Sequence, residues 1–308
     1  MQNNRYTIID LGSNSFHMLT VEKTDDGFNV LAKHKRKVRL ASGLDAQHNL
    51  NIETIENGLA CLRYFKEVLN DIKPLKLIIT ATAALRLANN RDIFITQAES
   101  ILAHPVNLIS GIEEAETIYR GVAFTERTDE QLLIIDIGGA STELVIGKGE
   151  NIIVAQSLSM GCVTWLANYF SDNKLNNENF NHAIAMANVV LQPTIESYTQ
   201  QGWNLAMGAS GTIQALQEIN TAQQLGSTLT LPLLNKVKQM CIACESIDKL
   251  QIVGLEASRI PVFASGLSIL IAIFEAFNIQ QLKPSQGALR EGLISIIFSD
   301  KTTSPFKI

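Results

Sequence analysis

Short apolar runs alternate with amphipathic stretches along this chain, and the alternation predicts a mixed α/β protein. Three β-branched apolar runs, at 7–11, 16–22 and 28–40, predict consecutive strands near the start. Helical spacing of apolar residues over 52–72 predicts a helix that ends before Pro74. The rest of the first half alternates strands and helices, with strands at 75–80 and 106–109 and helices at 83–88, 92–102 and 112–124.

The same order of elements begins again after Asp129. Strands are expected at 132–137, 142–146 and near Ile152, then a helical region over 163–198, a strand at 203–207, helices at 231–247 and 262–277, a strand at 279–283 and a helix at 287–298. A chain of 308 residues is long enough for two domains, each with its own core. The repeated order predicts two similar α/β domains, and ligands favour the cleft between such domains.

The pattern D-x-G-x-x-S occurs twice, at 10–15 and 136–141, each time between two predicted strands. Each copy predicts a β-hairpin with an acid at its tip. Glycine lets the backbone approach an anion closely, and the neighbouring aspartate can hold a divalent cation. One copy alone is typical of an ordinary hairpin turn. Two matching copies favour a duplicated clamp for phosphate and metal.

A third glycine motif, 208–212, lies between a predicted strand and a predicted helix. Backbone donors at a helix N-terminus bind anions, so Gly208, Ser210 and Gly211 are candidate phosphate-binding residues. A turn that simply needs glycine explains the motif equally well. The chain contains no G-x-x-x-x-G-K-[ST] sequence, which excludes a Walker-type phosphate loop.

Glu113, Glu114 and Glu116 fall in the first turns of the helix expected at 112–124. Acids there complement the helix dipole, which is a sufficient structural explanation. This helix lies at the junction of the two halves, however, so one of its carboxylates could reach the cleft and orient or deprotonate water. Arg86, near the end of the strand at 75–80, could bind a phosphate with two N–H groups, although exposed helix arginines are common.

A cationic strip on the third predicted strand consists of Lys33, Lys35, Lys37 and Arg39, which alternation places on one face. Such a run is often a solvated strand edge that discourages aggregation. In a net acidic chain it could equally guide a polyanionic substrate.

Composition excludes several classes of function. The chain is 46% hydrophobic and 18% charged with net charge −5, as in soluble globular proteins, so it has no general attraction for nucleic acid or membranes. The longest apolar stretch, 267–274, is too short to span a bilayer. No basic-then-apolar leader precedes the first strand, so we expect a cytoplasmic protein. Four scattered cysteines, including Cys241 and Cys244 in a helical stretch, favour core packing over a disulfide, redox or zinc role.

Four blocks, at 9–16, 109–115, 136–143 and 287–292, together resemble the exopolyphosphatase and guanosine pentaphosphatase (Ppx/GppA) family, in the family's order. Weaker likeness extends over 80–86 and 208–212. The resemblance implies an α/β fold of two ribonuclease-H-like domains from the actin and sugar-kinase superfamily, with a cleft between them. It places an N-terminal domain at 1–126, completed by a C-terminal helix at 290–308, and a second domain at 127–289.

The resemblance also implies residue roles. Glu114 would act on the attacking water, and Glu113 would be structural. A magnesium ion would be held by Asp10, Asp136 and Glu143. The implied phosphate contacts are Gly12, Ser13, Asn14, Arg86, Gly138, Gly139 and Ser141. Ala140 stands where the family usually has a third glycine, and alanine adopts positive φ less readily than glycine does.

The expected function is Mg²⁺-dependent hydrolysis of a terminal phosphoanhydride, with inorganic polyphosphate or guanosine pentaphosphate as substrate and with no DNA, RNA or membrane partner. By resemblance to short two-domain members, we expect a preference for short phosphate chains or nucleotides. Two alternatives stay open: a kinase of the same superfamily that transfers phosphate from ATP, and a non-catalytic sensor of alarmone or polyphosphate. The sequence does not choose between the two substrates. It also leaves a homodimer open, because the apolar helix around 269–277 could be core or dimer surface.

Overall fold

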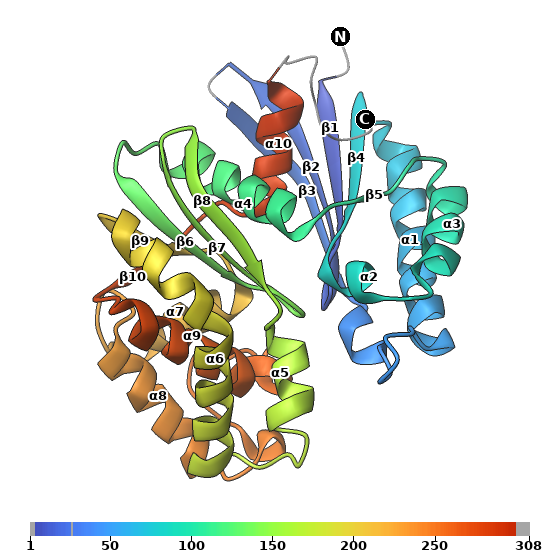
Figure 1. Ribbon diagram of the computed structural model, residues 1–308. Helices are drawn as coiled ribbons and strands as arrows, with labels where there is room; N and C mark the ends of the chain where they lie inside the picture. The colour runs from blue at the N-terminus through green and yellow to red at the C-terminus, as the bar shows by residue number, and fades with distance from the viewer. Residues whose placement is uncertain (1–3, 26, 300–308) are drawn as a thin grey trace.

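The computed structural model describes residues 4–25 and 27–299, which form two mixed five-stranded sheets with helices around them (Figure 1). The first sheet has the order β3-β2-β1-β4-β5, in which β1 pairs antiparallel with β2 and parallel with β4. Its half of the chain contains β1 (Arg5–Leu11), β2 (Ser15–Thr24), β3 (Gly27–Lys37), η1 (Leu40–Gly43), α1 (Ile52–Ile72), β4 (Lys76–Ala81), α2 (Ala83–Leu87), α3 (Arg91–Leu102), β5 (Asn107–Leu108) and α4 (Gly111–Glu126).

The second sheet repeats this topology, with the order β10-β9-β6-β7-β8. Its strands are paired in the same senses, since β6 is antiparallel to β7 and parallel to β9. This half contains β6 (Gln131–Ile137), β7 (Thr142–Lys148), β8 (Asn151–Leu158), α5 (Cys162–Tyr169), α6 (Asn177–Gln201), β9 (Leu205–Gly208), α7 (Gly211–Ala222), α8 (Leu231–Ala243), η2 (Ile247–Lys249), α9 (Ile260–Phe277), β10 (Leu282–Pro284) and α10 (Leu289–Phe298). The repeated α/β plan predicted from the sequence is confirmed.

Most predicted elements agree with the structure to within a few residues, and two differences have local causes. The third strand ends at Lys37 instead of continuing to residue 40, because Arg39 adopts a left-handed backbone and the chain enters η1. The helical region over 163–198 is divided into α5 and α6. Asn173, which is also left-handed, lies in the connection between them.

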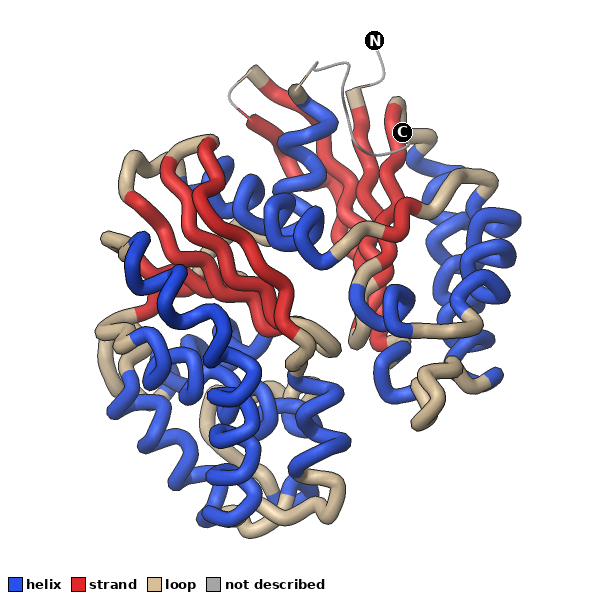
Figure 2. The backbone as a smooth tube through the Cα atoms, in the orientation of Figure 1, coloured by secondary structure: helices blue, strands red, loops and turns tan. Residues whose placement is uncertain are grey.

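Helices α4 and α10 cross between the two sheets, as the ribbon and the tube both show (Figures 1 and 2). Although α4 follows the first sheet in the chain, it packs on β7 and β8, whereas α10 packs on β1. The crossing needs glycine, because a Cβ on Gly121 would lie 2.0 Å from the Ala288 carbonyl oxygen and one on Gly292 would lie 1.9 Å from that of Thr117. The two halves thus hold each other through exchanged helices.

The domain limits at 1–126 and 127–289 stay a prediction. The described part of the expected C-terminal completion is α10, which contacts the first sheet as expected, and residues 300–308 of that segment lie outside the described residues.

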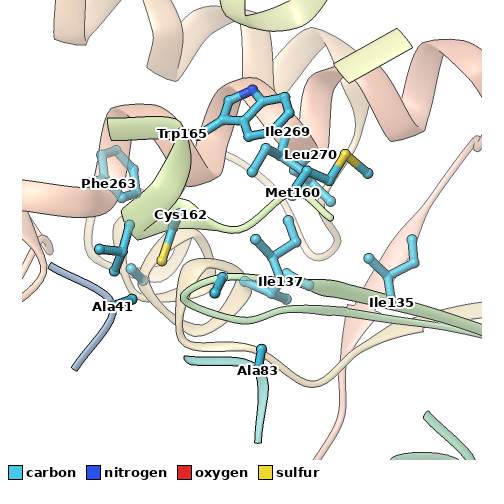
Figure 3. Packing of buried hydrophobic residues seen from close by; sticks show 14 of the residues in the cluster. Ala41, Ala83, Ile135, Ile137, Met160, Cys162, Trp165, Phe263, Ile269 and Leu270 are labelled. Carbon is cyan, nitrogen blue, oxygen red and sulfur yellow. The ribbon is translucent and has the colours of Figure 1, made fainter. Parts of the chain in front are cut away.

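Helix α9 is the centre of the larger hydrophobic core, with Ile269, Leu270, Phe263 and Trp165 meeting the end of β6 at Ile137 (Figure 3). It is long and apolar enough to cross a membrane, but 72% of it is buried inside the protein, as in the core helix of a soluble fold. Ile269, Ile271 and Ile273 are fully buried, so this part of the helix belongs to the core. Cys241, which the sequence assigned to core packing, is likewise buried and forms no disulfide.

Candidate active site

The two acidic hairpins meet at one cavity of about 490 Å³ between the sheets. Asp10 from the first hairpin and Asp136 from the second both line this main cavity. The loops touch directly, because a Cβ on Gly139 would lie 2.8 Å from the Ser13 Cβ. The predicted convergence of the two loops is therefore present in the structure.

Glycine is needed in both hairpin turns because of close backbone approach. A Cβ on Gly12 would lie 2.8 Å from the Ser15 carbonyl oxygen, and one on Gly138 would lie 3.0 Å from that of Ser141. Ala140 is buried at 3% exposure and does not have a left-handed backbone. Alanine therefore fits this loop without the backbone strain that a positive φ would cause.

Fourteen residues were predicted to be catalytic, metal-binding or phosphate-binding, and twelve of them line the main cavity. They are Asp10, Gly12, Ser13, Asn14, Glu114, Asp136, Gly138, Gly139, Ser141, Glu143, Ser210 and Gly211.

Gly208 and Arg86 do not line the main cavity, and their role as phosphate ligands stays a prediction. A Cβ on Gly208 would lie 2.3 Å from the Ile213 side chain, so packing of α7 against β9 explains that glycine. Arg86 lines a second, adjoining cavity and is bonded to Glu114.

Glu114 lies in the first turn of α4, is 8% exposed and faces the main cavity. Arg86 Nη1 donates to Glu114 Oε2 at 2.5 Å and to the Ile109 carbonyl at 3.2 Å. Burial raises the pKa of Glu114, and the Arg86 cation opposes that rise. Ser110 and Glu113 form a capping box instead, in which the Ser110 N–H donates to Glu113 Oε2 at 2.7 Å. These contacts agree with the expectation that Glu113 is structural and that Glu114 belongs to the site.

Three further carboxylates face the same cavity. Burial raises the pKa of Asp10 and of Asp136 to about 7, and it raises the pKa of Glu143 well above its usual range. Repulsion among these groups and Glu114 adds to the shifts. Glu143 Oε1 accepts a 2.7 Å hydrogen bond from the Ser157 hydroxyl, whereas Asp10 Oδ1 is buried with no hydrogen-bond partner.

Cations from distant segments balance part of this negative charge. Arg290, next to the start of α10, donates from Nη1 to His17 Nδ1 at 2.9 Å and lowers the pKa values of Asp10 and Asp136. Burial and the surrounding cations lower the pKa of His17 to about 2, so this imidazole is neutral and accepts at Nδ1. Arg259, before α9, lies against Gly211, where a Cβ would overlap its guanidinium.

The cationic strip on β3 divides between two surroundings. Lys33 and Lys35 line the main cavity, and burial and the neighbouring cations lower the pKa of Lys35 to about 8. Lys37 donates to the Ser258 carbonyl across the cleft, and Arg39 lies beyond the strand. Two of the four cations therefore line the cavity, and both lie exposed on this edge strand of the first sheet.

Comparison with known proteins agrees with this geometry. The model of the Ppx/GppA phosphatase family matches residues 19–299. The chain belongs to the Ppx/GppA phosphatase family.

Named relatives of this family come from several bacteria. The chain is 51% identical over 289 residues to a guanosine-5'-triphosphate,3'-diphosphate pyrophosphatase of Aeromonas salmonicida, covering 94% of this chain and 58% of the relative. It is 49% identical over 295 residues to a protein of the same name from Vibrio cholerae, and the match covers 96% of this chain and 59% of the relative. The chain thus spans about 58% of the length of the curated relatives it matches.

Solved structures show the same fold. An exopolyphosphatase from Cytophaga hutchinsonii is 24% identical with a TM-score of 0.87, covering 95% of this chain and 97% of that one. A Ppx/GppA family member from Aquifex aeolicus is 23% identical with a TM-score of 0.78, and the match covers 96% of this chain and 98% of that one. The α/β class and the two-sheet architecture of the chain are those of the family.

Enzymes of the Ppx/GppA family generally depend on a divalent metal, so we tested whether the carboxylates fit one. Within residues 4–25 and 27–299, no three His, Cys, Asp or Glu side chains come close enough to hold a metal ion by themselves. A preformed three-carboxylate site of Asp10, Asp136 and Glu143 is therefore not present. Mg²⁺ is usually bound by one or two carboxylates together with water and substrate phosphates. The unpartnered Asp10 Oδ1 and the raised pKa values, which a nearby cation would lower, fit that kind of site.

Sequence reasoning assigned no role to Arg290, Arg259 or His17. Arg290 stands inside the family block at 287–292, so that block was a usable signal. His17 lies two residues after the first motif and pairs with Asp10 across the hairpin, so strand register could have indicated it. Arg259 has no motif around it, and only the packing of α9 against α7 brings it to the cavity.

Proposed function

We propose that the protein hydrolyses the terminal phosphoanhydride of guanosine pentaphosphate or of inorganic polyphosphate. The observation that carries the proposal is the position of Glu114, a buried carboxylate in the wall of a cavity formed by two glycine-cornered loops. The names of the Aeromonas and Vibrio relatives support the nucleotide as substrate. The name of the Cytophaga protein suggests polyphosphate as the second candidate.

In the proposed reaction Glu114 orients a water molecule and accepts its proton. The water oxygen forms a bond to the terminal phosphorus while the bridging P–O bond breaks, and its electron pair leaves with the shortened chain. The products are inorganic phosphate and a chain with one phosphate fewer. A general base works best when its pKa is near the working pH, so the raised pKa of Glu114 suits this role. Arg86 would act as a positioning residue that holds the Glu114 carboxylate.

Backbone N–H groups of the two loops would hold the terminal phosphoryl group, with Gly12, Ser13 and Asn14 on one side and Gly138, Gly139 and Ser141 on the other. The Ser210–Gly211 start of α7 adds a helix N-terminus beside them. Phosphoryl transfer depends mainly on positioning and charge stabilisation, so these groups are sufficient for it.

Asp10, Asp136 and Glu143 are the residues that would hold Mg²⁺ together with the substrate. The ion would neutralise phosphate charge when bound. Lys35 and Arg290 are placed to neutralise the remaining negative charge of the phosphate chain.

The test replaces Glu114 with glutamine and measures phosphate released from guanosine pentaphosphate, polyphosphate of two lengths, ATP and pyrophosphate with Mg²⁺. We expect kcat to fall by roughly 10²- to 10⁴-fold, which is the usual contribution of a general base. Substrate binding measured by calorimetry should persist.

Glu113→Gln is the matched control, because this neighbouring glutamate caps α4 and should affect stability more than turnover. Full phosphate release by Glu114→Gln would contradict the proposal. Transfer of phosphate from ATP to an added acceptor, with no free phosphate, would indicate a kinase. Tight binding by the unaltered protein with no turnover would indicate a sensor.

A further inference from the structure

A second cavity of about 310 Å³ lies directly behind the Arg86–Glu114 pair. Glu114 lines only the main cavity and Arg86 lines only the second one, yet they are joined by a 2.5 Å hydrogen bond. Ala83 and Ser141 line both cavities. The partition between the two spaces is therefore one ion pair with two small side chains beside it.

The second cavity has the chemistry of an anion path. It is lined by the Arg86 guanidinium, by the hydroxyl-bearing residues Ser110, Ser157 and Ser159, and by Gly111 at the start of the 16-residue helix α4. None of the described residues that line it is acidic, whereas four carboxylates line the main cavity. The Ser157 hydroxyl already donates to Glu143 Oε1, so the donors that remain are the Arg86 guanidinium and the Ser110 and Ser159 hydroxyls. An anion that crosses the partition therefore leaves a wall of like charge for one that offers N–H and O–H donors.

Arg86 is arranged to face both sides. Its Nη1 is held by Glu114 and the Ile109 carbonyl, while its Nη2 is directed toward Gly111, where a Cβ would lie 3.7 Å from it. A side chain at Gly111 would also overlap Ser157, with a Cβ 2.5 Å from the Ser157 Cβ. The absence of a side chain at Gly111 thus keeps the space beside Arg86 open.

If the protein hydrolyses a phosphoanhydride as proposed, the direction of the reaction assigns a role to the second cavity. In an in-line displacement the water attacks from the side opposite the leaving chain, so the detached phosphoryl group moves toward Glu114. The shortened chain still occupies the main cavity at that moment. From these observations we propose that the second cavity is the exit for inorganic phosphate, which passes the Arg86–Glu114 pair before the longer product leaves.

Two exposed residues at the opening of the second cavity, Ile112 and Ser159, can be substituted without changing the proposed catalytic residues. Ile112 is 45% exposed and Ser159 is exposed, and both line the second cavity only. Ile112→Trp would narrow the mouth, with Ile93→Trp on the exposed face of α3 as the matched control. Ser159→Glu would place a negative charge at the mouth, and Ser159→Gln provides the same size without the charge.

The experiment follows a single turnover of guanosine pentaphosphate with enzyme in excess. Acid quenching measures the total phosphate cleaved, and a fluorescent phosphate sensor measures phosphate free in solution. For Ile112→Trp and Ser159→Glu we expect cleavage at the unaltered rate but free phosphate delayed by roughly tenfold, since release of product can limit turnover. The two controls should show no delay.

Coincident quench and sensor traces in both mouth variants would overturn the exit while leaving the hydrolase intact. A delay of equal size in Ser159→Gln and Ser159→Glu would also overturn it, because the proposed path is selective for charge. Absence of cleavage of both guanosine pentaphosphate and polyphosphate by the unaltered protein would instead refute the proposed function. Because Ser159 is exposed, its two variants keep the test valid even if Ile112→Trp folds poorly.

Discussion

The two D-x-G-x-x-S hairpins have the same strand register, but the side chains beside their aspartates differ in charge. In the first, Asp10 pairs across β1 and β2 with His17, which pairs with Lys35 on β3. In the second, Asp136 pairs with Glu143, which pairs with Ser157 on β8. Residues opposite one another on paired strands share a sheet face, and both rows line the main cavity except for Ser157, which lines the second cavity. The first row is basic beyond its aspartate, and the second is acidic.

This difference shows how a duplicated scaffold can produce an asymmetric site. The neutral imidazole of His17, held by Arg290, and the Lys35 ammonium suit a phosphate chain. The Glu143 carboxylate, held by Ser157, suits a cation or a polarised water molecule. Glu114 comes from neither hairpin but from the crossing helix α4, which places it between the two rows.

Replacing the charged or polar side chain at the same position of each row tests whether the two rows differ in function. Glu143→Gln keeps the side-chain shape, and we expect phosphate release to fall by about 10²-fold, because supporting groups in metal sites typically contribute 10- to 100-fold. His17→Gln should cost less than roughly 10-fold, since it removes one hydrogen bond from Arg290. Phosphate release measured over a series of Mg²⁺ concentrations distinguishes the two. Equal losses at every Mg²⁺ concentration would show that the rows are equivalent.

The two aspartates, in contrast, should behave alike. Each has its pKa raised from 3.8 to about 7 by burial, so between these values the folded protein binds protons that the unfolded chain has lost. The free energy of unfolding should therefore fall as pH rises from about 4 to about 7 in metal-free protein, and then level off. Thermal melts in EDTA across this range measure the trend. Asp10→Asn and Asp136→Asn should each flatten part of it, and stability that rises over this range would contradict the assigned shifts.

The smallest expected effect concerns the third loop position, which is Asn14 in the first hairpin and Ala140 in the second. Because Ala140 has an ordinary backbone conformation, Ala140→Gly should lower the free energy of unfolding by about 0.4–1 kcal/mol through the greater freedom of the unfolded chain. Turnover should stay within roughly twofold, since no side-chain hydrogen bond is lost. Asn14→Gly keeps the backbone N–H but removes the side-chain amide, and we expect the loss of one side-chain hydrogen bond to substrate to raise KM by about 3- to 10-fold. Urea unfolding measures the stability of Ala140→Gly, and steady-state kinetics measure the turnover and KM of both variants. A large gain in activity from Ala140→Gly would show that alanine restricts the loop.

Local patterns in the sequence were sufficient for most of the fold. The limits of α1 were predicted to the residue, because its apolar spacing and Pro74 are local signals. The hairpins were likewise predictable, since alternation and turn glycines act over a few residues. Their convergence on one cavity followed from the repeat itself.

Other features depended on neighbours that no local pattern specifies. The hydrogen bond from Arg86 to Glu114 and the packing of Ile213 from α7 against Gly208 are contacts that no local pattern indicated. Arg259 and Arg290 reach the main cavity only because α9 and α10 begin beside it.

The sequence by itself determined the strands, the helices, the acidic hairpins and the candidate base. Hydrogen bonds within helices and turns, and the two periodicities of buried residues, are short-range effects that can be read from adjacent positions. The tertiary structure decided which charges face one another and where the second cavity lies. Those outcomes depend on how α4 and α10 cross between the sheets, and that crossing is set by contacts between residues more than 150 positions apart in the chain.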